Sequence, residues 1–294
     1  MHNIKITDVR ALPGDSAFLL DDGETAVLYD TGFAFTGYAV ADKIKKALGE
    51  RPLDYIFLTH SHYDHALGSV YVKRRYPDAK IVAGEYAAKI FAKPTARAVM
   101  REMDRKFAVK CGVGEYEDLI DDICADVTVA DGDVIQAGKM HFTAVGFPGH
   151  TRCSVGYYLA ENKLLLGSET LGVYAGDGIV VPSCLVGCKI TLDSIRKALE
   201  MDIESVLVPH FGLLEGEDTQ KYLYGGKRST EDTLLEIVDL IRIGKSDEDV
   251  VEFFREKFYH GYVKEIYPSD AMELNTKIMI GLVHREILGE ESAS

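Results

Sequence analysis

The stretch Thr59-His60-Ser61-His62-Tyr63-Asp64-His65 places four potential metal ligands within six residues. It directly follows the apolar run Tyr55-Ile56-Phe57-Leu58, which reads as a buried strand. Because side chains two apart in extended chain lean to the same side, His60 and His62 can converge on one point. Any one of these histidines alone would more often be structural. Imidazoles and a carboxylate packed this closely suit zinc, iron or manganese, so the stretch predicts a metal site.

The composition is that of an ordinary globular protein with an acidic surface. Of its 294 residues, 47% are hydrophobic, enough for one large domain or two ordinary ones. Forty-seven acidic residues against 33 basic ones give a net charge of −14, which repels nucleic acid and anionic membranes. We therefore expect a small-molecule substrate, and neither nucleic acid nor membrane as a partner.

Export signals and paired cysteines are both absent from the sequence. No run of about 18 apolar residues suggests a membrane span, and the N-terminal residues lack the basic and apolar segments of a signal peptide. The five cysteines form an odd set without a ladder of spacings, as expected of reduced thiols. These features predict a cytoplasmic location.

Strand-like and helix-like stretches alternate through most of the chain, which predicts a layered α/β fold. Residues 25–32 read as an apolar strand that runs into a turn at Asp30, and residues 40–48 read as a helix that stops at Gly49. Asp30 can stabilise its own turn or support the histidine loop from behind. The sequence favours neither role of Asp30 over the other.

A helical pattern from Glu85 to Phe107, interrupted at Pro94, contains two methionines beyond the proline. Met100 and Met103 could line a pliable apolar substrate pocket, although packing in the core is the simpler interpretation.

The stretches after this helix are strand-like, and later the chain becomes helical. Residues 127–129, 134–135 and 141–145 are separated by short turns and predict a β-meander.

The last part of the chain reads as a helical tail. Ser229 with Asp232, and Ser246 with Asp249, have the spacing of capping boxes before apolar periodic runs. A third helix should start at Ser269 or Asp270. We predict a main domain over residues 1–228 and a helical extension over residues 229–294 packed on it.

Two single histidines also stand at the ends of apolar strands. His150 lies in Phe147-Pro148-Gly149-His150-Thr151, and His210 follows Val206-Leu207-Val208-Pro209. Alone, either would be interpreted as structural. A position after a strand and a proline or glycine turn favours metal ligation instead.

Taken in order, these residues resemble the metallo-β-lactamase superfamily over roughly residues 3–215. The shared pattern is an aspartate after an early strand, a His-x-His-x-Asp-His loop, a Gly-His-Thr segment, a later carboxylate and a final strand-end histidine. It looks like Asp30, His60 to His65, Gly149-His150-Thr151, the region around Glu169, and His210. The resemblance implies a four-layer αββα sandwich with a dinuclear metal site along one edge of the sheets, here followed by a C-terminal helical extension.

The resemblance also implies the ligands of two divalent ions. His60, His62 and His150 would hold one ion. Asp64, His65 and His210 would hold the other. Zn2+ is the first choice for both, with Fe or Mn as alternatives.

The chain departs from the family pattern after Gly167. The family usually places an aspartate there, bridging both metals, whereas this chain has Ser168 and then Glu169. A serine hydroxyl is a poor bridge between dications. Glu169 has one more methylene than aspartate and can reach back if the backbone bulges after Gly167, so we predict Glu169 as the bridging ligand. The alternative is weak or missing occupancy of the second ion.

A dinuclear site of this kind predicts a metal-dependent hydrolase. Two ions about 3.5 to 4 Å apart share a water, lower its pKa and polarise the oxygen that gains charge, and Asp64 can accept a hydrogen bond from the resulting hydroxide. We expect cleavage of an ester-like bond, a thioester or a lactone, in a small molecule. The helical tail resembles in placement that of glyoxalase II-type thioesterases, without a clear counterpart of their basic glutathione-binding motif.

Three alternatives stay open at this point. Phosphodiester hydrolysis is the runner-up. Flavodiiron-type oxygen reductases share the fold, but they typically replace the second loop histidine with a carboxylate, so His62 argues against them. A non-catalytic metal-binding sensor is the third alternative, because Ser168 breaks the usual pattern.

Overall fold

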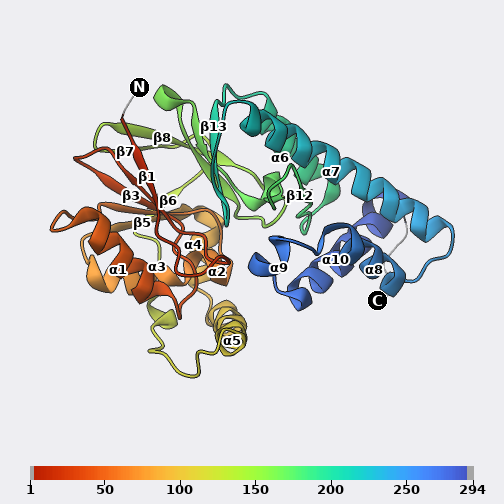
Figure 1. Ribbon diagram of the computed structural model, residues 1–294, viewed down its shortest axis with the longest axis horizontal. Helices are drawn as coiled ribbons and strands as arrows, with labels where there is room; N and C mark the ends of the chain where they lie inside the picture. Colours follow the sequence, from red (N-terminus) through yellow and green to blue (C-terminus); the bar gives the residue numbers. More distant parts are fainter. Residues whose placement is uncertain (1–2, 290–294) are drawn as a thin grey trace. The chain divides into compact units, whose positions relative to one another are not determined.

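Residues 3–289 are described by the computed structural model, and residues 1–2 and 290–294 lie outside it (Figure 1). The described chain forms two compact units, the first made of residues 3–146 and 153–167 and the second of residues 147–152 and 168–289. No helix within residues 3–289 combines the length and the apolar character that crossing a bilayer requires.

The first unit is built on a mixed six-stranded sheet in which the strands follow their sequence order. The strands are β1 (Lys5–Asp8), β2 (Phe18–Asp21), β3 (Ala26–Tyr29), β4 (Tyr55–Leu58), β5 (Lys80–Gly84) and β6 (Val127–Val129). Strands β1 to β3 pair antiparallel, and β3 to β6 pair parallel. Because parallel strands end at the same edge of a sheet, Asp30 after β3 and the histidine loop after β4 meet there.

Helices of the first unit follow its parallel strands. They are α1 (Gly37–Leu48), α2 (Tyr63–Ala66), α3 (Gly68–Arg75), α4 (Glu85–Phe91) and α5 (Pro94–Lys110), with a 3-10 turn at Ile120–Asp122. Figure 1 shows α1 and α3 on one face of the sheet, where Val40 and Ile44 of α1 are fully buried. Helix α1 ends at Gly49, with φ of 64°, and Pro94 opens α5, both as the sequence predicts.

Four antiparallel strands complete the first unit. They are β7 (Val134–Ala137), β8 (Met140–Gly146), β9 (Val155–Leu159) and β10 (Leu164–Leu166), with a 3-10 turn at Ala160–Asn162. They pack on the first sheet through aromatic rings: the ring centroid of Phe57 lies 4.5 Å from that of Tyr157 and 5.1 Å from that of Phe142. The Tyr157 hydroxyl also donates to the carbonyl oxygen of Leu58 at 2.8 Å.

The predicted meander is wrong in one strand. Strand β6 pairs parallel with β5 in the first sheet, with Val82 opposite Val127, and only β7 and β8 form the hairpin. Short apolar strands have the same pattern in either sheet, so periodicity alone could not assign β6.

The second unit combines two strand hairpins with the C-terminal helices. Its strands are β11 (Val173–Tyr174) paired with β12 (Val180–Val181), and β13 (Ser205–Val208) paired with β14 (Gly212–Glu215). Its helices are the 3-10 turn η3 (Glu169–Leu171), α6 (Cys188–Leu199), α7 (Glu217–Arg242), α8 (Asp247–Phe258), α9 (Val263–Ile266), α10 (Ser269–Val283) and the π-helical η4 (His284–Leu288). An apolar core of α7, α8 and α10 side chains holds this unit together.

Of the three helix starts predicted for the helical tail, two are confirmed and one is wrong. Ser229 lies in the middle of α7, and its hydroxyl donates to the carbonyl oxygen of Val180 at 2.7 Å instead of capping a helix. The predicted capping box at Ser246 is confirmed, as is the helix start at Ser269. The division of the chain at residue 228 stays a prediction.

Candidate metal centre

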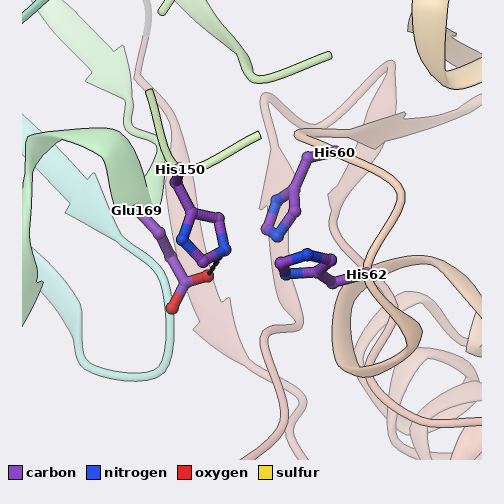
Figure 2. A group of neighbouring side chains, drawn as sticks. All are labelled: His60, His62, His150 and Glu169. Carbon is purple, nitrogen blue, oxygen red and sulfur yellow. Dashed lines mark ion pairs between the residues drawn. The ribbon is translucent and has the colours of Figure 1, made fainter. Parts of the chain in front are cut away.

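The histidine loop brings its four predicted ligands together within the first unit. His60 lies in the loop after β4, and α2 begins at Tyr63, so that Asp64 and His65 occupy its first turn. The ring centroid of His60 lies 4.6 Å from that of His62 and 4.1 Å from that of His65. Figure 2 shows the rings of His60 and His62 close together, one beside the other. His60 and His65 are fully buried, whereas Asp64 is partly exposed.

Asp30 holds this loop from behind with a fully buried carboxylate. It accepts hydrogen bonds from the backbone N–H of Thr59 at 2.8 Å and from the hydroxyl of Ser16 at 3.0 Å. Its Oδ2 lies 2.7 Å from Nδ1 of His65. Asp30 adopts φ of 52°, a left-handed conformation that aspartate tolerates better than most residues. Asp30 therefore supports the histidine loop from behind, and its suggested role in its own turn stays a prediction.

Two hydrogen bonds orient the rings of this loop. The Thr59 hydroxyl donates to Asp30 and lies 2.9 Å from Nδ1 of His60, so it accepts from that nitrogen. Nδ1 of His65 donates to Asp30 in the same way. With Nδ1 protonated, Nε2 of each ring keeps the lone pair that a metal ion needs, and in His65 this atom lies 3.7 Å from Oδ2 of Asp64.

In the second unit, His150 lies in a loop that is tightly fixed by its neighbours. Its backbone N–H donates to the Thr170 hydroxyl at 3.0 Å, and its Nδ1 lies 2.5 Å from the Ser183 hydroxyl. The preceding Gly149 leaves room for this approach, because a Cβ there would come within 2.5 Å of Thr170 and 2.7 Å of Thr191. The ring of His150 is thus held through Nδ1, as are those of His60 and His65.

Glu169 places one carboxylate oxygen near each of two histidines of the second unit. Its Oε2 lies 2.8 Å from Nε2 of His150, the ion pair drawn in Figure 2, and its Oε1 lies 3.4 Å from Nε2 of His210. Ligand atoms that share one ion at about 2.1 Å lie about 3 to 3.4 Å apart. The spacing to His210 is within this range, whereas the spacing to His150 is that of a direct hydrogen-bonded ion pair.

The turn at Ser168 explains why Glu169 faces the histidines. Ser168 caps the 3-10 turn η3, and its hydroxyl accepts from the backbone N–H of Thr170. The backbone thereby turns Glu169 inward, where its side chain is only 4% exposed. The expected bulge after Gly167 is replaced by this 3-10 turn, and the bridging role of Glu169 stays a prediction.

His210 comes from the hairpin between β13 and β14. It adopts φ of 62°, and its side chain is nearly fully buried. Its carbonyl oxygen accepts a hydrogen bond from the Tyr262 hydroxyl at 2.6 Å, which ties the hairpin to the segment before α9. The strand-end position that suggested ligation from sequence is therefore a buried and fixed one.

Together the predicted ligands supply five imidazoles and two carboxylates. Such a set suits zinc, iron or manganese. In His60, His65 and His150 the Nδ1 atom is held by an oxygen partner, the arrangement typical of metal-binding histidines. The residues present therefore fit divalent ions.

Three supporting residues were not found from sequence. Thr59 and Ser183 hold histidine rings, and Asp104 is a buried carboxylate behind the loop that follows Asp30. The position of Thr59 next to His60 was an available signal. Ser183 and Asp104 lie in stretches without a motif, and only the fold brings them to their partners.

Residues 13–240 match the family model described as the metallo-beta-lactamase superfamily. The chain belongs to the metallo-β-lactamase superfamily. The resemblance seen in the sequence is thereby confirmed.

Solved structures show that the chain has the metallo-β-lactamase fold. A metallo-β-lactamase family protein from Thermus thermophilus has a TM-score of 0.63 at 17% identity, covering 92% of this chain and 88% of that one. A metallo-β-lactamase superfamily protein from Sulfolobus tokodaii has a TM-score of 0.56 at 17% identity, covering 80% and 87%. The predicted αββα class with a C-terminal helical region is confirmed.

Relatives known from sequence include hydrolases. A probable metallo-hydrolase of Streptococcus pyogenes is 24% identical over 165 residues, 55% of this chain and 64% of that protein. Glyoxylase B2 of Dictyostelium discoideum is 30% identical over 129 residues, covering 43% and 39%. An acyl-coenzyme A thioesterase of Gallus gallus is 26% identical over 177 residues, covering 58% and 60%. Each match spans less than two thirds of the relative's own length.

Proposed function

We propose that this metallo-β-lactamase superfamily member is a metal-dependent hydrolase that cleaves an ester-like bond, a thioester or a lactone, in a small molecule. The orientation of the donor atoms carries this proposal. Nδ1 of His60, His65 and His150 is held by oxygen partners, which leaves Nε2 for coordination. A buried carboxylate that turns one oxygen to His150 and the other to His210 fits the place between two ions.

We assign the proposed ligands to two ions. His60, His62, His150 and Glu169 are the candidates for one ion, and Asp64, His65 and His210 are those for the other. Zn2+ is our first choice, and Fe or Mn would suit the same donors. When bound, a pair of divalent ions supplies Lewis-acid polarisation of the scissile carbonyl and lowers the pKa of the attacking water.

The chain's own residues would orient the reactants. Asp64 is the proposed catalytic residue, because its partly exposed carboxylate can accept a hydrogen bond from the attacking water. Asp30, Thr59 and Ser183 act behind the histidines and fix their rings, so that the donor atoms need no rearrangement when the substrate arrives.

The choice of an ester-like substrate is supported by the relatives, among them proteins named hydroxyacylglutathione hydrolase and acyl-coenzyme A thioesterase. A cytoplasmic location and a small-molecule substrate, without nucleic acid or membrane as partner, belong to the same proposal. The acidic charge of −14 supports the exclusion of nucleic acid and weighs against phosphodiester hydrolysis in a polynucleotide.

The test combines metal analysis with a substrate panel. We expect metal to co-purify and thioester or lactone turnover to exceed phosphodiester turnover. Replacing His62 by alanine should abolish turnover while circular dichroism stays unchanged. His141→Ala is the matched control, because His141 is exposed and pairs only with Glu161 among the described contacts.

Any other outcome would favour a different function. Bound metal without any turnover would contradict the hydrolase and favour a sensor. Turnover confined to phosphodiesters would favour the runner-up. Undiminished activity of His62→Ala would reject the metal centre itself.

A further inference from the structure

Aromatic rings gather beside the histidine loop within the first unit. Phe33 is nearly fully buried, and its ring centroid lies 4.7 Å from that of Phe107 and 5.1 Å from that of Phe35. Tyr63 is the residue between His62 and Asp64, and its ring centroid lies 5.6 Å from that of Phe33. An apolar cluster therefore begins at the residue that separates two proposed metal ligands.

The outer side chains of this cluster are partly exposed to solvent. Phe35, Tyr63 and Phe107 are each partly exposed. Met103 is 37% exposed and Val99 is 57% exposed, and they precede Phe107 on α5 at intervals of four residues. Side chains four apart lie on the same face of a helix, so the apolar surface continues along α5 for about 12 Å. We call Phe35, Tyr63, Phe107, Met103 and Val99 the apolar wall.

The two methionines of α5 take different places. Met100 is 6% exposed and belongs to the core of the first unit, as the simpler interpretation of the sequence held. Met103 lies instead on the exposed face beside Phe107. A flexible, polarizable thioether at such a place suits contact with ligands of variable shape.

A buried carboxylate fixes the loop that carries Phe33 and Phe35. Asp104 of α5 is fully buried, accepts a hydrogen bond from the backbone N–H of Ala34 at 2.8 Å, and accepts another from the Tyr116 hydroxyl at 2.5 Å. Burial raises the pKa of Asp104 to about 6. An apolar residue would fill this place without the cost of burying a carboxyl group, so its presence points to a loop that must be held in one position.

We propose that the apolar wall binds the apolar acyl chain of the substrate, whose ester-like carbonyl lies next to Asp64 and His62. This inference rests on the proposed hydrolase and narrows its substrates to acyl thioesters or esters with a chain of medium length. A strip of apolar side chains that begins at Tyr63, between two proposed metal ligands, and continues for about 12 Å along α5 matches an extended chain of that kind. Each methylene that the wall buries should tighten binding by up to about fourfold.

The test measures binding apart from turnover. Acetate, hexanoate and decanoate are titrated into the metal-loaded protein by isothermal calorimetry, and initial rates are measured on acyl thioesters of the same three chain lengths. We expect the dissociation constant and KM to fall at least tenfold from the two-carbon to the ten-carbon chain.

Two variants of α5 separate the wall from general surface effects. Met103→Asp should weaken decanoate binding about tenfold or more and leave acetate unchanged. Val109→Asp is the matched control, because Val109 is 66% exposed on the same helix but lies on a different face from Met103. We expect it to behave like the wild type.

The possible outcomes keep the two proposals apart. Chain-length-dependent binding without turnover would refute the hydrolase while supporting the wall as a binding surface. Turnover that is independent of chain length, or equal effects of Met103→Asp and Val109→Asp, would overturn the wall and leave the hydrolase standing.

Discussion

The two halves of the proposed metal centre are built by different means. In the first unit, four candidate ligands come from one short loop, and a buried carboxylate, Asp30, holds this loop through Thr59 and His65. In the second unit, His150, Glu169 and His210 come from three separate segments, and hydroxyl groups of Ser183, Thr170 and Tyr262 hold the two histidines.

This difference has physical consequences. A carboxylate partner makes an imidazole more basic and holds it by charge, whereas a hydroxyl partner orients the ring without adding charge. The first half should therefore depend more strongly on its supporting residue than the second. Experiments that treat the halves in parallel can test this contrast.

The largest effect is expected when a ligand is removed from the first half. His62→Ala should lower turnover by about 1,000-fold or more, because loss of a ligand removes several kcal/mol of charge stabilisation. Steady-state kinetics with a matched metal analysis measures this. A reduction of less than tenfold would show that the loop does not hold the catalytic ion.

The next effect probes the departure from the family pattern in the second half. Glu169→Gln should reduce turnover about 100-fold and lower the metal content from two ions toward one, because an amide is a weaker bridge than a carboxylate.

Ser168→Ala is the control for Glu169→Gln. Since Ser168 caps a 3-10 turn, its loss should cost about 1 kcal/mol of stability and change turnover only a few-fold. A larger loss of activity in Ser168→Ala than in Glu169→Gln would assign the bridge to the serine position.

Smaller effects are expected from the supporting residues, and here the halves should differ directly. Asp30→Asn should weaken metal affinity about 100-fold, and Ser183→Ala about tenfold, since only the former removes a charge behind a histidine. Competition with a chelator gives both affinities. Equal losses would mean that the kind of partner, carboxylate or hydroxyl, does not matter.

The smallest effect on activity is expected for Asp104, whose main effect is on stability. We expect it to make the free energy of unfolding depend on pH. Burial raises the pKa of Asp104 from 3.8 to about 6. Because the folded state then holds the proton more tightly than the unfolded state, the contribution of Asp104 to the free energy of unfolding is highest below pH 4. It should fall by up to about 3 kcal/mol as the pH rises from 4 through 6.

Asp104→Asn should remove this dependence. Urea unfolding of the wild type and of Asp104→Asn between pH 4 and 7 provides the comparison. If the two proteins lose stability in parallel over this range, another group is responsible.

The contrast between the halves also explains what could be predicted from sequence. Ligands within one loop after an apolar strand can be recognised from sequence, because residues that are close along the chain are also close in space there. Asp30 was recognised because it ends an apolar strand, and the structure shows that this strand pairs parallel with β4.

The remaining parts depended on tertiary structure. Ser183 reaches His150 across 33 positions of the chain, and Asp104 reaches Ala34 across 70, so no local pattern could identify either. The assignment of β6 to the first sheet and the position of Ser229 inside α7 were missed for the same reason. Apolar periodicity says which face of an element is buried but not which partner covers it.

The central claim is that both halves bind one pair of ions, and anomalous diffraction from crystals of the metal-loaded protein tests it most directly. We expect two peaks, one bound by His60, His62 and His150 and the other by Asp64, His65 and His210, with the Glu169 carboxylate between them. A single peak held by the histidine loop alone, or ions bound elsewhere, would contradict it.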